Sequence, residues 1–331
     1  MSILVTGGAG YIGSHTIAEL IAHHEEVVVV DNLSLGHSEV IRVLDVPFYQ
    51  VNISDKEKLI SIMRDHKTDV VVHFAAFSQV GESVRLPLKY YQNNVTGTTE
   101  LLSAMVEARV NNIVFSSTAA TYGEPEAVPI TETHPKHPSN PYGESKLAIE
   151  RMLHWCYQAY GIQSISLRYF NAAGAHPKLP IGEHHENESH LIPIVLQAAL
   201  GIRDHVAVFG SDYPTSDGSC IRDYIHVMDL ASAHRLAVDR LRSTRMGAEA
   251  YNLGIGQGYS VMEVIETART VTQREIPVVL GERREGDPAV LVAAPDLAKR
   301  VLQWEPAYQG LSGIIESAWK WHLSQPNGYS S

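Results

Sequence analysis

The chain has 331 residues and a formal net charge of −11, which suits two lobes or one large α/β domain with an addition. Nucleic acid is not expected as a partner, because phosphate binding requires a basic stripe that an acidic chain lacks. The two cysteines, Cys156 and Cys220, favour a reducing compartment over a disulfide framework. Because neither a signal-type leader nor a membrane-length apolar run is found, the sequence predicts a cytoplasmic protein with no membrane partner.

The first half of the chain alternates short apolar segments with segments of helical spacing. Near-continuous Val and Ile runs are typical of parallel strands that are covered on both faces. Strands are expected at Ser2–Thr6, Glu26–Asp31, Val46–Val51, Asp69–Phe74, Asn112–Ser116 and Gln163–Tyr169. Helices are expected at Ile12–His23, Lys56–Asp65, Pro87–Ala108 and Pro141–Tyr160. Repeated βα units predict an α/β fold with a doubly wound parallel sheet.

The pattern changes after Tyr169, because Gly, Pro, His and Asn are scattered through Asn171–Asp223. This stretch is expected to form a loop-rich cap over the carboxyl ends of the strands. Regular elements resume at Val227–Arg240, Glu249–Gly254, Val261–Thr272, Pro277–Leu280 and Leu311–Leu323. The sequence therefore predicts a larger domain of residues 1–170 plus about 225–254. Residues 171–224 plus 255–331 would form a smaller, discontinuous lobe.

Glycines at Gly7, Gly10 and Gly13 follow the first strand and open the first helix. This spacing permits a tight turn and a close approach of the backbone to a pyrophosphate at a helix N-terminus. It differs from the usual Gly-x-Gly-x-x-Gly, and alone it indicates only a tight strand–helix turn. The next strand, however, ends at Asp31, where a carboxylate can accept hydrogen bonds from ribose hydroxyls. Asn32 rather than an arginine follows Asp31, so a 2′-phosphate would meet a carboxylate, and NAD is favoured over NADP.

Tyr142 and Lys146 lie four residues apart in a predicted helix and so share one face. A free tyrosine titrates near pH ~10, and a nearby ammonium together with a positive nicotinamide favours its phenolate. Tyr142 can then move a proton to or from a substrate hydroxyl as hydride moves to or from NAD. Thr118, after a strand, can hydrogen-bond the same oxygen. The alternatives are a surface pair on a helix for Tyr142 and Lys146, and a capping hydroxyl for Thr118.

Together these motifs resemble the extended short-chain dehydrogenase/reductase family, and within it the nucleotide-sugar 4-epimerases, nearly end to end. They stand at Thr6–His15, Asp31–Asn32, His73–Ala76, Asn93–Val95, Ser116–Gly123, Asn140–Lys146, Arg168–Pro177, Arg222–Ala231 and Arg283–Ala289. The resemblance implies a Rossmann-like NAD-binding domain and a UDP-sugar-binding lobe. It implies an NAD-dependent isomerase that interconverts UDP-galactose and UDP-glucose through a transient 4-keto sugar. It also implies a homodimer, formed through the helices at Pro87–Ala108 and Pro141–Tyr160.

The resemblance assigns site residues in three groups. Catalysis is assigned to Thr118, Tyr142 and Lys146. NAD binding is assigned to Gly7, Gly10, Tyr11, Ile12, Gly13, Asp31, Asn32, Asn52, Ile53, Phe74, Ala75, Ala76, Asn93, Ser116, Tyr142, Lys146 and Tyr169. Substrate binding is assigned to Thr118, Tyr142, Asn171, His190, Leu191, Phe209, Arg222, Arg284, Asp287 and Leu291. Arginines suit a diphosphate, although ordinary surface ion pairing is the alternative.

Three positions depart from the family pattern. Asn52 stands where the family often has an acid, and its carbonyl can still accept from the adenine amine. Ser78 stands where some members carry a lysine, and His190 where many carry an asparagine. With His184–His185, His190 could suggest a metal, but a solvated polar loop is expected and the chemistry needs no metal.

Other functions within and beyond the family stay open at this point. A nucleotide-sugar dehydratase or decarboxylase would place an acid after the active-site hydroxyl, where this chain has Ala119 and Ala120. A non-catalytic NAD-sensing protein typically loses the tyrosine that is kept here as Tyr142. Leu291 replaces a tyrosine that restricts some members to plain hexoses. Some activity on UDP-N-acetylglucosamine, inferior to that on plain hexoses, is therefore expected.

Overall fold

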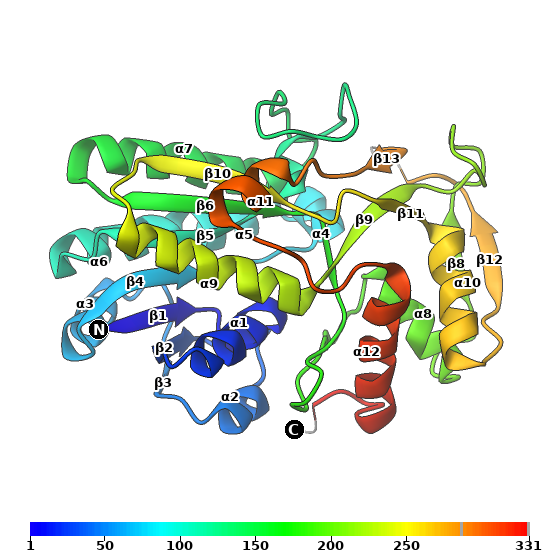
Figure 1. Ribbon diagram of the computed structural model, residues 1–331, viewed down its shortest axis with the longest axis horizontal. Coiled ribbons are helices and arrows are strands. Elements are labelled where there is room, and N and C mark those ends of the chain that lie inside the picture. The colour runs from blue at the N-terminus through cyan, green and yellow to red at the C-terminus, as the bar shows by residue number, and fades with distance from the viewer. Residues whose placement is uncertain (285–286, 330–331) are drawn as a thin grey trace.

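Seven parallel strands form the central sheet of the computed structural model, which describes residues 1–284 and 287–329. Glu285 and Gly286 of the Arg283–Ala289 motif lie outside the described residues. The sheet order is β10-β6-β5-β4-β1-β2-β3 (Figure 1). The strands are β1 (Ser2–Thr6), β2 (Glu26–Asp31), β3 (Phe48–Gln50), β4 (Thr68–His73), β5 (Asn112–Thr118), β6 (Gln163–Tyr169) and β10 (Ala248–Leu253). The strand order reverses between β1 and β4, and ligands bind at the carboxyl ends of strands at such a point.

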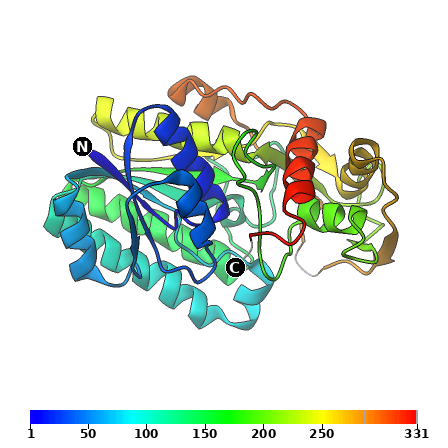
Figure 2. The same ribbon diagram turned by 90° about the horizontal axis from the view of Figure 1, so that it is seen from below.

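Helices cover both faces of this sheet, so the predicted doubly wound α/β fold is confirmed (Figure 2). Successive strand residues point to opposite faces: Ile3 and Val5 enter one apolar core, and Leu4 enters the other. The first core is closed by α1 (Tyr11–Ala22), α2 (Ser38–Leu44) and α9 (Val227–Ser243). The second is closed by α3 (Lys56–Asp65), α6 (Gly97–Ala108) and α7 (Pro141–Tyr160).

The helix expected at Pro87–Ala108 has the predicted ends but an irregular interior. It consists of α5 (Pro87–Tyr90), a π-helical turn η1 (Tyr91–Thr96) and α6, and it follows the short helix α4 (Val80–Arg85). Wider turns of this kind often occur at functional sites. Here the π-helical turn carries Asn93 and the buried Asn94.

Much of the expected loop-rich segment Asn171–Asp223 is irregular, but the prediction missed the short strands and the helix that it contains. Strands β7 (Asn171–Ala173), β9 (Ile221–His226), β11 (Gly258–Ser260) and β13 (Val290–Leu291) form one sheet, and β8 (Val206–Phe209) pairs with β12 (Val278–Gly281). Helices α8 (Leu191–Ala199), α10 (Val261–Thr272) and α12 (Leu311–Ser324) enclose a separate apolar core. Helix α8 accommodates Pro193 because N–H groups in a first helical turn have no intrahelical partner.

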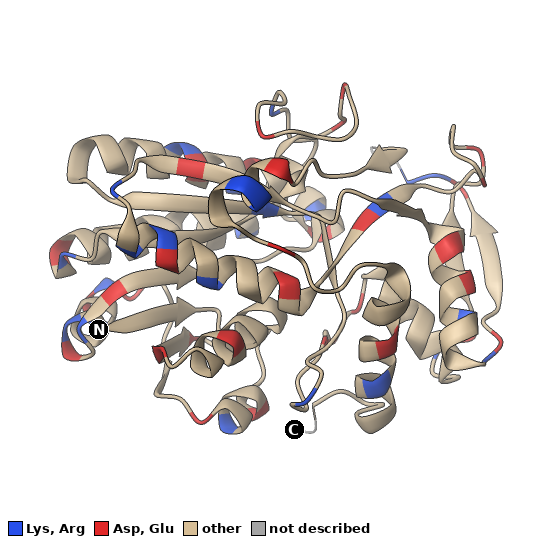
Figure 3. Ribbon diagram, in the orientation of Figure 1, with Lys and Arg blue, Asp and Glu red and all other residues tan. Residues whose placement is uncertain are grey.

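The later part of the chain also contacts the first domain. Helix α11 (Asp296–Leu302) packs against α9 and β10, and the buried Trp304 joins the same core. The proposed division of the chain into two lobes therefore stays a prediction. Positions of Lys and Arg alternate with positions of Asp and Glu along much of the ribbon (Figure 3). Among the described residues, no helix is both long and apolar enough to cross a membrane.

Candidate active site

One cavity of about 730 Å³ lies at the carboxyl ends of the central strands. The glycine turn after β1 and Asp31 at the end of β2 line one part of it. Tyr142 of α7 lines another part, and Arg222 lines the cavity from β9 of the four-stranded sheet. The cavity therefore brings together residues that lie far apart in the sequence, from Gly7 to Leu291.

The glycine turn has a shape that side chains would obstruct. Gly7 has φ +73°, and a Cβ there would lie 2.5 Å from the backbone nitrogen of Ala75. A Cβ on Gly13 would lie 2.4 Å from the carbonyl oxygen of Gly7. Gly10 precedes α1 without a side-chain cap, so the first N–H groups of the helix remain available. Such a helix N-terminus fits the phosphates of a dinucleotide.

Asp31 is held in place by the backbone at the end of β2. Its two carboxylate oxygens accept from the N–H groups of Ala9 at 3.0 Å and Leu33 at 2.8 Å. Burial raises the pKa of Asp31, and these hydrogen bonds oppose the increase. Because a carboxylate has about four acceptor positions, others remain free for ribose hydroxyls. Among the described residues that line the cavity, Lys146 and Arg222 are the only lysine and arginine, so this lining places no lysine or arginine beside Asp31 for a 2′-phosphate.

The start of α7 places Tyr142 and Lys146 in the cavity. The side chain of Asn140 accepts from the N–H of Gly143 at 2.9 Å and caps the helix, and Pro141 occupies its first position. Lys146 Nζ donates to the carbonyl oxygen of Ser116 at 2.8 Å and lies 6.0 Å from the centre of the Tyr142 ring.

Thr118 ends β5 beside this pair. Its Oγ1 accepts from the N–H of Ala120 at 3.1 Å, so it caps the short 3₁₀ helix η2 (Ala119–Thr121). The hydroxyl proton remains available as a donor while the oxygen acts as a cap. Capping and contact with a ligand are therefore compatible at this residue.

Burial determines the protonation of Tyr142 and Lys146. It raises the pKa of Tyr142 to about 12, against the opposing effect of a hydrogen bond with Thr118. It lowers the pKa of Lys146 to about 7, while the Glu150 carboxylate acts in the opposite direction. The phenol is therefore neutral at pH 7 in the protein alone. Lys146 alone does not offset the burial of the phenol, and the expected combined effect of Lys146 and the nicotinamide stays a prediction.

A buried ion pair supports the helix that carries these residues. Arg168 donates to the Glu150 carboxylate through Nε at 2.8 Å and Nη2 at 2.6 Å, and the side chains are 5% and 9% exposed. Glu150 also accepts from the Ser117 hydroxyl at 2.6 Å. The pair thus joins α7 to β5 and β6 next to the cavity.

The end of the cavity in the second lobe contains a cation, an acid and an apolar wall. Arg222 and Asp287 form an ion pair there. Leu291 lines the cavity and packs against a small core that includes Ala119 and Tyr122. The wall at Leu291 is thus apolar and lies close to the end of β5.

The model of the NAD dependent epimerase/dehydratase family matches residues 3–254. The chain belongs to this family. Curated UDP-glucose 4-epimerases from Halalkalibacterium halodurans and Lacticaseibacillus casei are 57% and 50% identical to it. These alignments cover 100% and 99% of this chain, and 98% and 99% of the relatives.

Solved structures resemble this member of the epimerase/dehydratase family over its whole length. A crystal structure of UDP-glucose 4-epimerase superposes with a TM-score of 0.97 at 50% identity, and the match covers 100% of both chains. The enzyme from Stenotrophomonas maltophila, with bound NAD and formylated UDP-arabinopyranose, gives 0.95 at 41% identity over 98% of this chain and 99% of its own.

Most of the predicted site residues of this family member lie around the one cavity. Four do not line it. Asn52 is exposed, and its amide oxygen accepts from the N–H and hydroxyl of Ser54 at 3.0 and 2.9 Å. Leu191 packs against the core of the second lobe, and the Arg284 guanidinium lies 4.0 Å from the centre of the Phe209 ring. The residues that do line it are Gly7, Gly10, Tyr11, Ile12, Gly13, Asp31, Asn32, Ile53, Phe74, Ala75, Ala76, Asn93, Ser116, Thr118, Tyr142, Lys146, Tyr169, Asn171, His190, Arg222, Asp287 and Leu291.

Sequence reasoning missed two features of this family member. Asn94 exchanges hydrogen bonds with the backbone of Phe77 at 2.9 and 3.0 Å and so fixes a stretch of cavity wall. A buried polar cluster includes Glu183, which also lines the cavity. The π-helical turn that carries Asn94 has no recognisable sequence signature, whereas the histidines near Glu183 were noted but expected to be solvated.

Proposed function

We propose that this chain interconverts UDP-galactose and UDP-glucose by inverting carbon 4 of the sugar, with NAD as a tightly bound cofactor. One observation carries the proposal: Tyr142, Lys146 and Thr118 share a single cavity with the glycine turn and Asp31. Full-length similarity to curated UDP-glucose 4-epimerases agrees with it. The chain is accordingly an NAD-dependent isomerase.

The cofactor site fits NAD on the shape of the turn and the chemistry of Asp31. Gly7, Gly10 and Gly13 would hold the pyrophosphate against the start of α1, and Asp31 would accept from the adenosine ribose. When bound, NAD supplies the acceptor and the donor of hydride for carbon 4.

The residues of the chain supply proton transfer and orientation. Tyr142 Oη takes the proton of the 4-hydroxyl and later returns one to the same oxygen. Thr118 Oγ1 holds that oxygen in reach, and Lys146 Nζ fixes the carbonyl group of Ser116 at the edge of the cavity. Because the pKa of Tyr142 is about 12 in the protein alone, the phenol needs an adjacent positive charge before it can act as a base at pH 7.

UDP recognition leaves the sugar free to turn. Arg222 would bind the diphosphate and Asp287 a ribose hydroxyl, and each would then exchange its present partner for the ligand. Binding energy from these remote groups retains the 4-keto sugar without fixing one of its faces. Hydride can therefore return to either face of carbon 4.

A dehydratase is disfavoured by the residues after Thr118. Ala119 and Ala120 line the cavity and offer no second acid or base. Epimerisation of UDP-N-acetylglucosamine is proposed as a slower second activity, because Leu291 leaves more room than a tyrosine for a 2-acetamido group.

We also propose that the chain acts in the cytoplasm as a homodimer. Both cysteines are free thiols, as a reducing compartment would keep them. Apolar side chains are exposed around the helices that the family resemblance assigns to a dimer: Leu88 is 79% exposed, Trp155 69% and Tyr160 60%. Burial of such a surface is typical of a subunit interface. Analytical ultracentrifugation of the native chain and of Trp155→Glu would test this assembly.

The function is tested by incubating the protein with UDP-galactose and following UDP-glucose. Conversion should proceed without added NAD, and denatured protein should release NAD. A stoichiometric requirement for added NAD would instead indicate a dehydrogenase. Absence of conversion, with NAD still bound, would favour a non-catalytic NAD-binding protein.

A further inference from the structure

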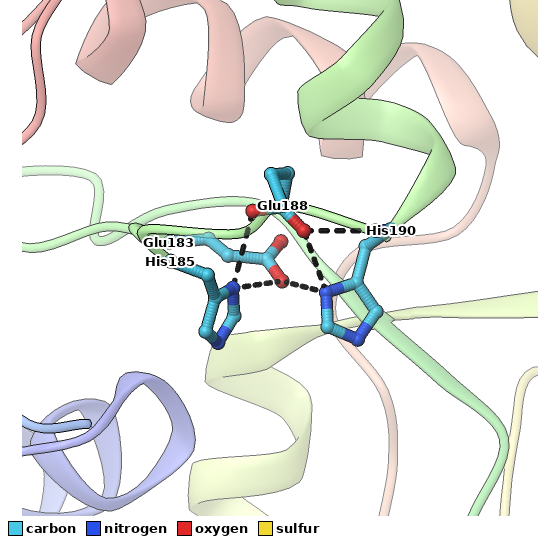
Figure 4. Close-up of side chains that lie close together, drawn as sticks. All are labelled: Glu183, His185, Glu188 and His190. Carbon is cyan, nitrogen blue, oxygen red and sulfur yellow. Dashed lines mark hydrogen bonds and ion pairs between the residues drawn. The ribbon is translucent and has the colours of Figure 1, made fainter. Parts of the chain in front are cut away.

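Two glutamates and two histidines converge beside the cavity, and Glu183, His185 and His190 also line it. Glu183, His185, Glu188 and His190 each offer one ligand atom, and these atoms all lie within 4.8 Å of one another (Figure 4). Within the described part of the chain, no other group of three or more His, Cys, Asp or Glu residues is arranged in this way. The cluster is independent of Tyr142, Lys146 and Thr118.

The carboxylates of this cluster are buried, in contrast to the solvated loop expected from the sequence. The side chains of Glu183 and Glu188 are 5% and 3% exposed, whereas those of His185 and His190 are 25% and 50% exposed. The described ion pairs of both glutamates involve only these histidines. Two adjacent buried carboxylates require nearby positive charge to offset the loss of hydration.

We propose that Glu183, His185, Glu188 and His190 bind one divalent transition-metal ion, with zinc as the best match to these ligands. Zinc takes imidazole nitrogen and carboxylate oxygen in tetrahedral geometry. With bonds of about 2.0–2.1 Å, neighbouring ligand atoms of a tetrahedron lie about 3.3–3.4 Å apart. The structure places His190 Nδ1 2.9 Å from oxygens of both Glu183 and Glu188. His185 Nδ1 lies 3.1 Å from Glu188 and 3.6 Å from Glu183.

Backbone hydrogen bonds anchor Glu188 within the cluster. Glu188 Oε1 accepts from the backbone N–H groups of Ser189 and His190, each at 2.8 Å. The other oxygen, Oε2, lies 3.1 Å from His185 Nδ1 and is free of these backbone contacts. Anchoring of one carboxylate oxygen by the backbone is the kind of outer support that fixes a metal ligand. Two carboxylates with two neutral imidazoles carry a charge of −2, which one divalent ion cancels.

Four protein ligands leave no open position, so this metal is structural rather than catalytic. Its loop ends at His190, directly before α8 of the second lobe. The same loop touches the first domain, because Gln79 donates to the carbonyl of Asn187 at 3.3 Å and a ring nitrogen of His37 lies 3.1 Å from the carbonyl oxygen of His184. The ion would fix this segment where it crosses the cavity between the two lobes.

The test uses the full chain, without a histidine tag, and zinc chloride as the probe. Protein dialysed against a chelator is titrated with Zn²⁺ by calorimetry, and its melting temperature is recorded with and without the metal. The native chain should bind one Zn²⁺ and melt at a higher temperature when it is loaded. His185→Gln and Glu188→Gln should each weaken binding by at least about 10-fold, a loss that even residues orienting a ligand can cause.

His184→Gln is the matched control, because it lies in the same loop and stacks on His37 with ring centres 4.7 Å apart, outside the cluster. It should bind Zn²⁺ as the native chain does. The proposal is overturned if the native chain takes up no more zinc than His185→Gln, or if the control loses zinc to the same extent. The proposal is also overturned if the cluster is only an ion-pair network. In that case His185→Gln would lower the melting temperature of the chelator-treated protein, and zinc would raise the melting temperature of neither the native chain nor His185→Gln.

Discussion

Gly7→Ala tests whether the glycine turn is required by contact with the neighbouring strand or only by its backbone angle. The chain offers a matched control at Gly161, which has the same φ of +73° but no atom within 4 Å of an added Cβ. A non-glycine residue in the left-handed region costs about 1–2 kcal/mol, which is the expected loss in free energy of unfolding for Gly161→Ala. At Gly7 the new Cβ also meets the backbone of Ala75 at 2.5 Å, and such overpacking costs about 1–3 kcal/mol more.

Gly7→Ala should therefore lower the free energy of unfolding by about 2–5 kcal/mol. It should also lose most of its bound NAD, because the shifted backbone no longer fits a pyrophosphate. Urea unfolding of NAD-free protein gives the first quantity, and NAD released from purified, denatured protein gives the second. If Gly7→Ala is no less stable than Gly161→Ala and retains NAD, the close approach of the turn to Ala75 is not what requires glycine.

Three further predictions follow from burial and shape. Glu150→Gln leaves the buried Arg168 charge without its partner and should lower the free energy of unfolding, measured in urea, by about 3–5 kcal/mol. The control Glu266→Gln removes an exposed ion pair and should lower it by at most about 1 kcal/mol. Burial lowers the pKa of Lys146 to about 7, so between pH 7 and about 10 the unfolded chain binds more protons than the folded one. Relative to Lys146→Met, the free energy of unfolding of the native chain should accordingly rise over that interval by up to about 1.4 kcal/mol per pH unit. The two proteins are compared free of NAD. If the difference between their free energies of unfolding does not change with pH, the pKa of Lys146 is not lowered. Leu291→Tyr should raise the preference for UDP-galactose over UDP-N-acetylglucosamine by about 10–200-fold in kcat/KM, and an unchanged ratio would mean that Leu291 does not control sugar size.

Helices that begin with a local capping signal could be predicted to the residue at their first position. Helix α3 begins after Asp55, whose side chain accepts from the N–H of Lys58, and α7 begins at the Asn140 cap and Pro141. Helix α10 begins after Ser260, which forms a capping box with Glu263. Such signals lie within a few residues of the helix that they start, so they can be recognised in the sequence alone.

The second lobe depends on contacts between distant segments, which a local pattern does not reveal. Strand β7 pairs with β9 more than 50 residues later, and the two-residue β13 pairs with the same strand. With three and two residues, β7 and β13 are too short to show strand periodicity in the sequence. The scattered Gly, Pro, His and Asn residues of Asn171–Asp223 therefore favoured loops over these short strands.

The candidate site shows the same contrast. The expectation that Tyr142 and Lys146 share a helix face needed only their spacing of four residues. Burial of Glu150 against Arg168, and of Glu183 and Glu188 against two histidines, depends on the tertiary structure. Glutamate is usually exposed, so the sequence gives no indication of these positions.

We propose that Tyr142 moves the proton in an epimerisation that regenerates its own NAD, and the Tyr142→Phe variant removes only the group that carries this proton. The variant keeps the ring and its packing but loses the hydroxyl. Conversion of UDP-galactose to UDP-glucose should fall by about 10²–10⁴-fold, while bound NAD and calorimetric affinity for UDP-glucose stay close to those of the native chain. Near-native turnover in Tyr142→Phe, with NAD and sugar binding intact, would rule out Tyr142 as the group that moves the proton.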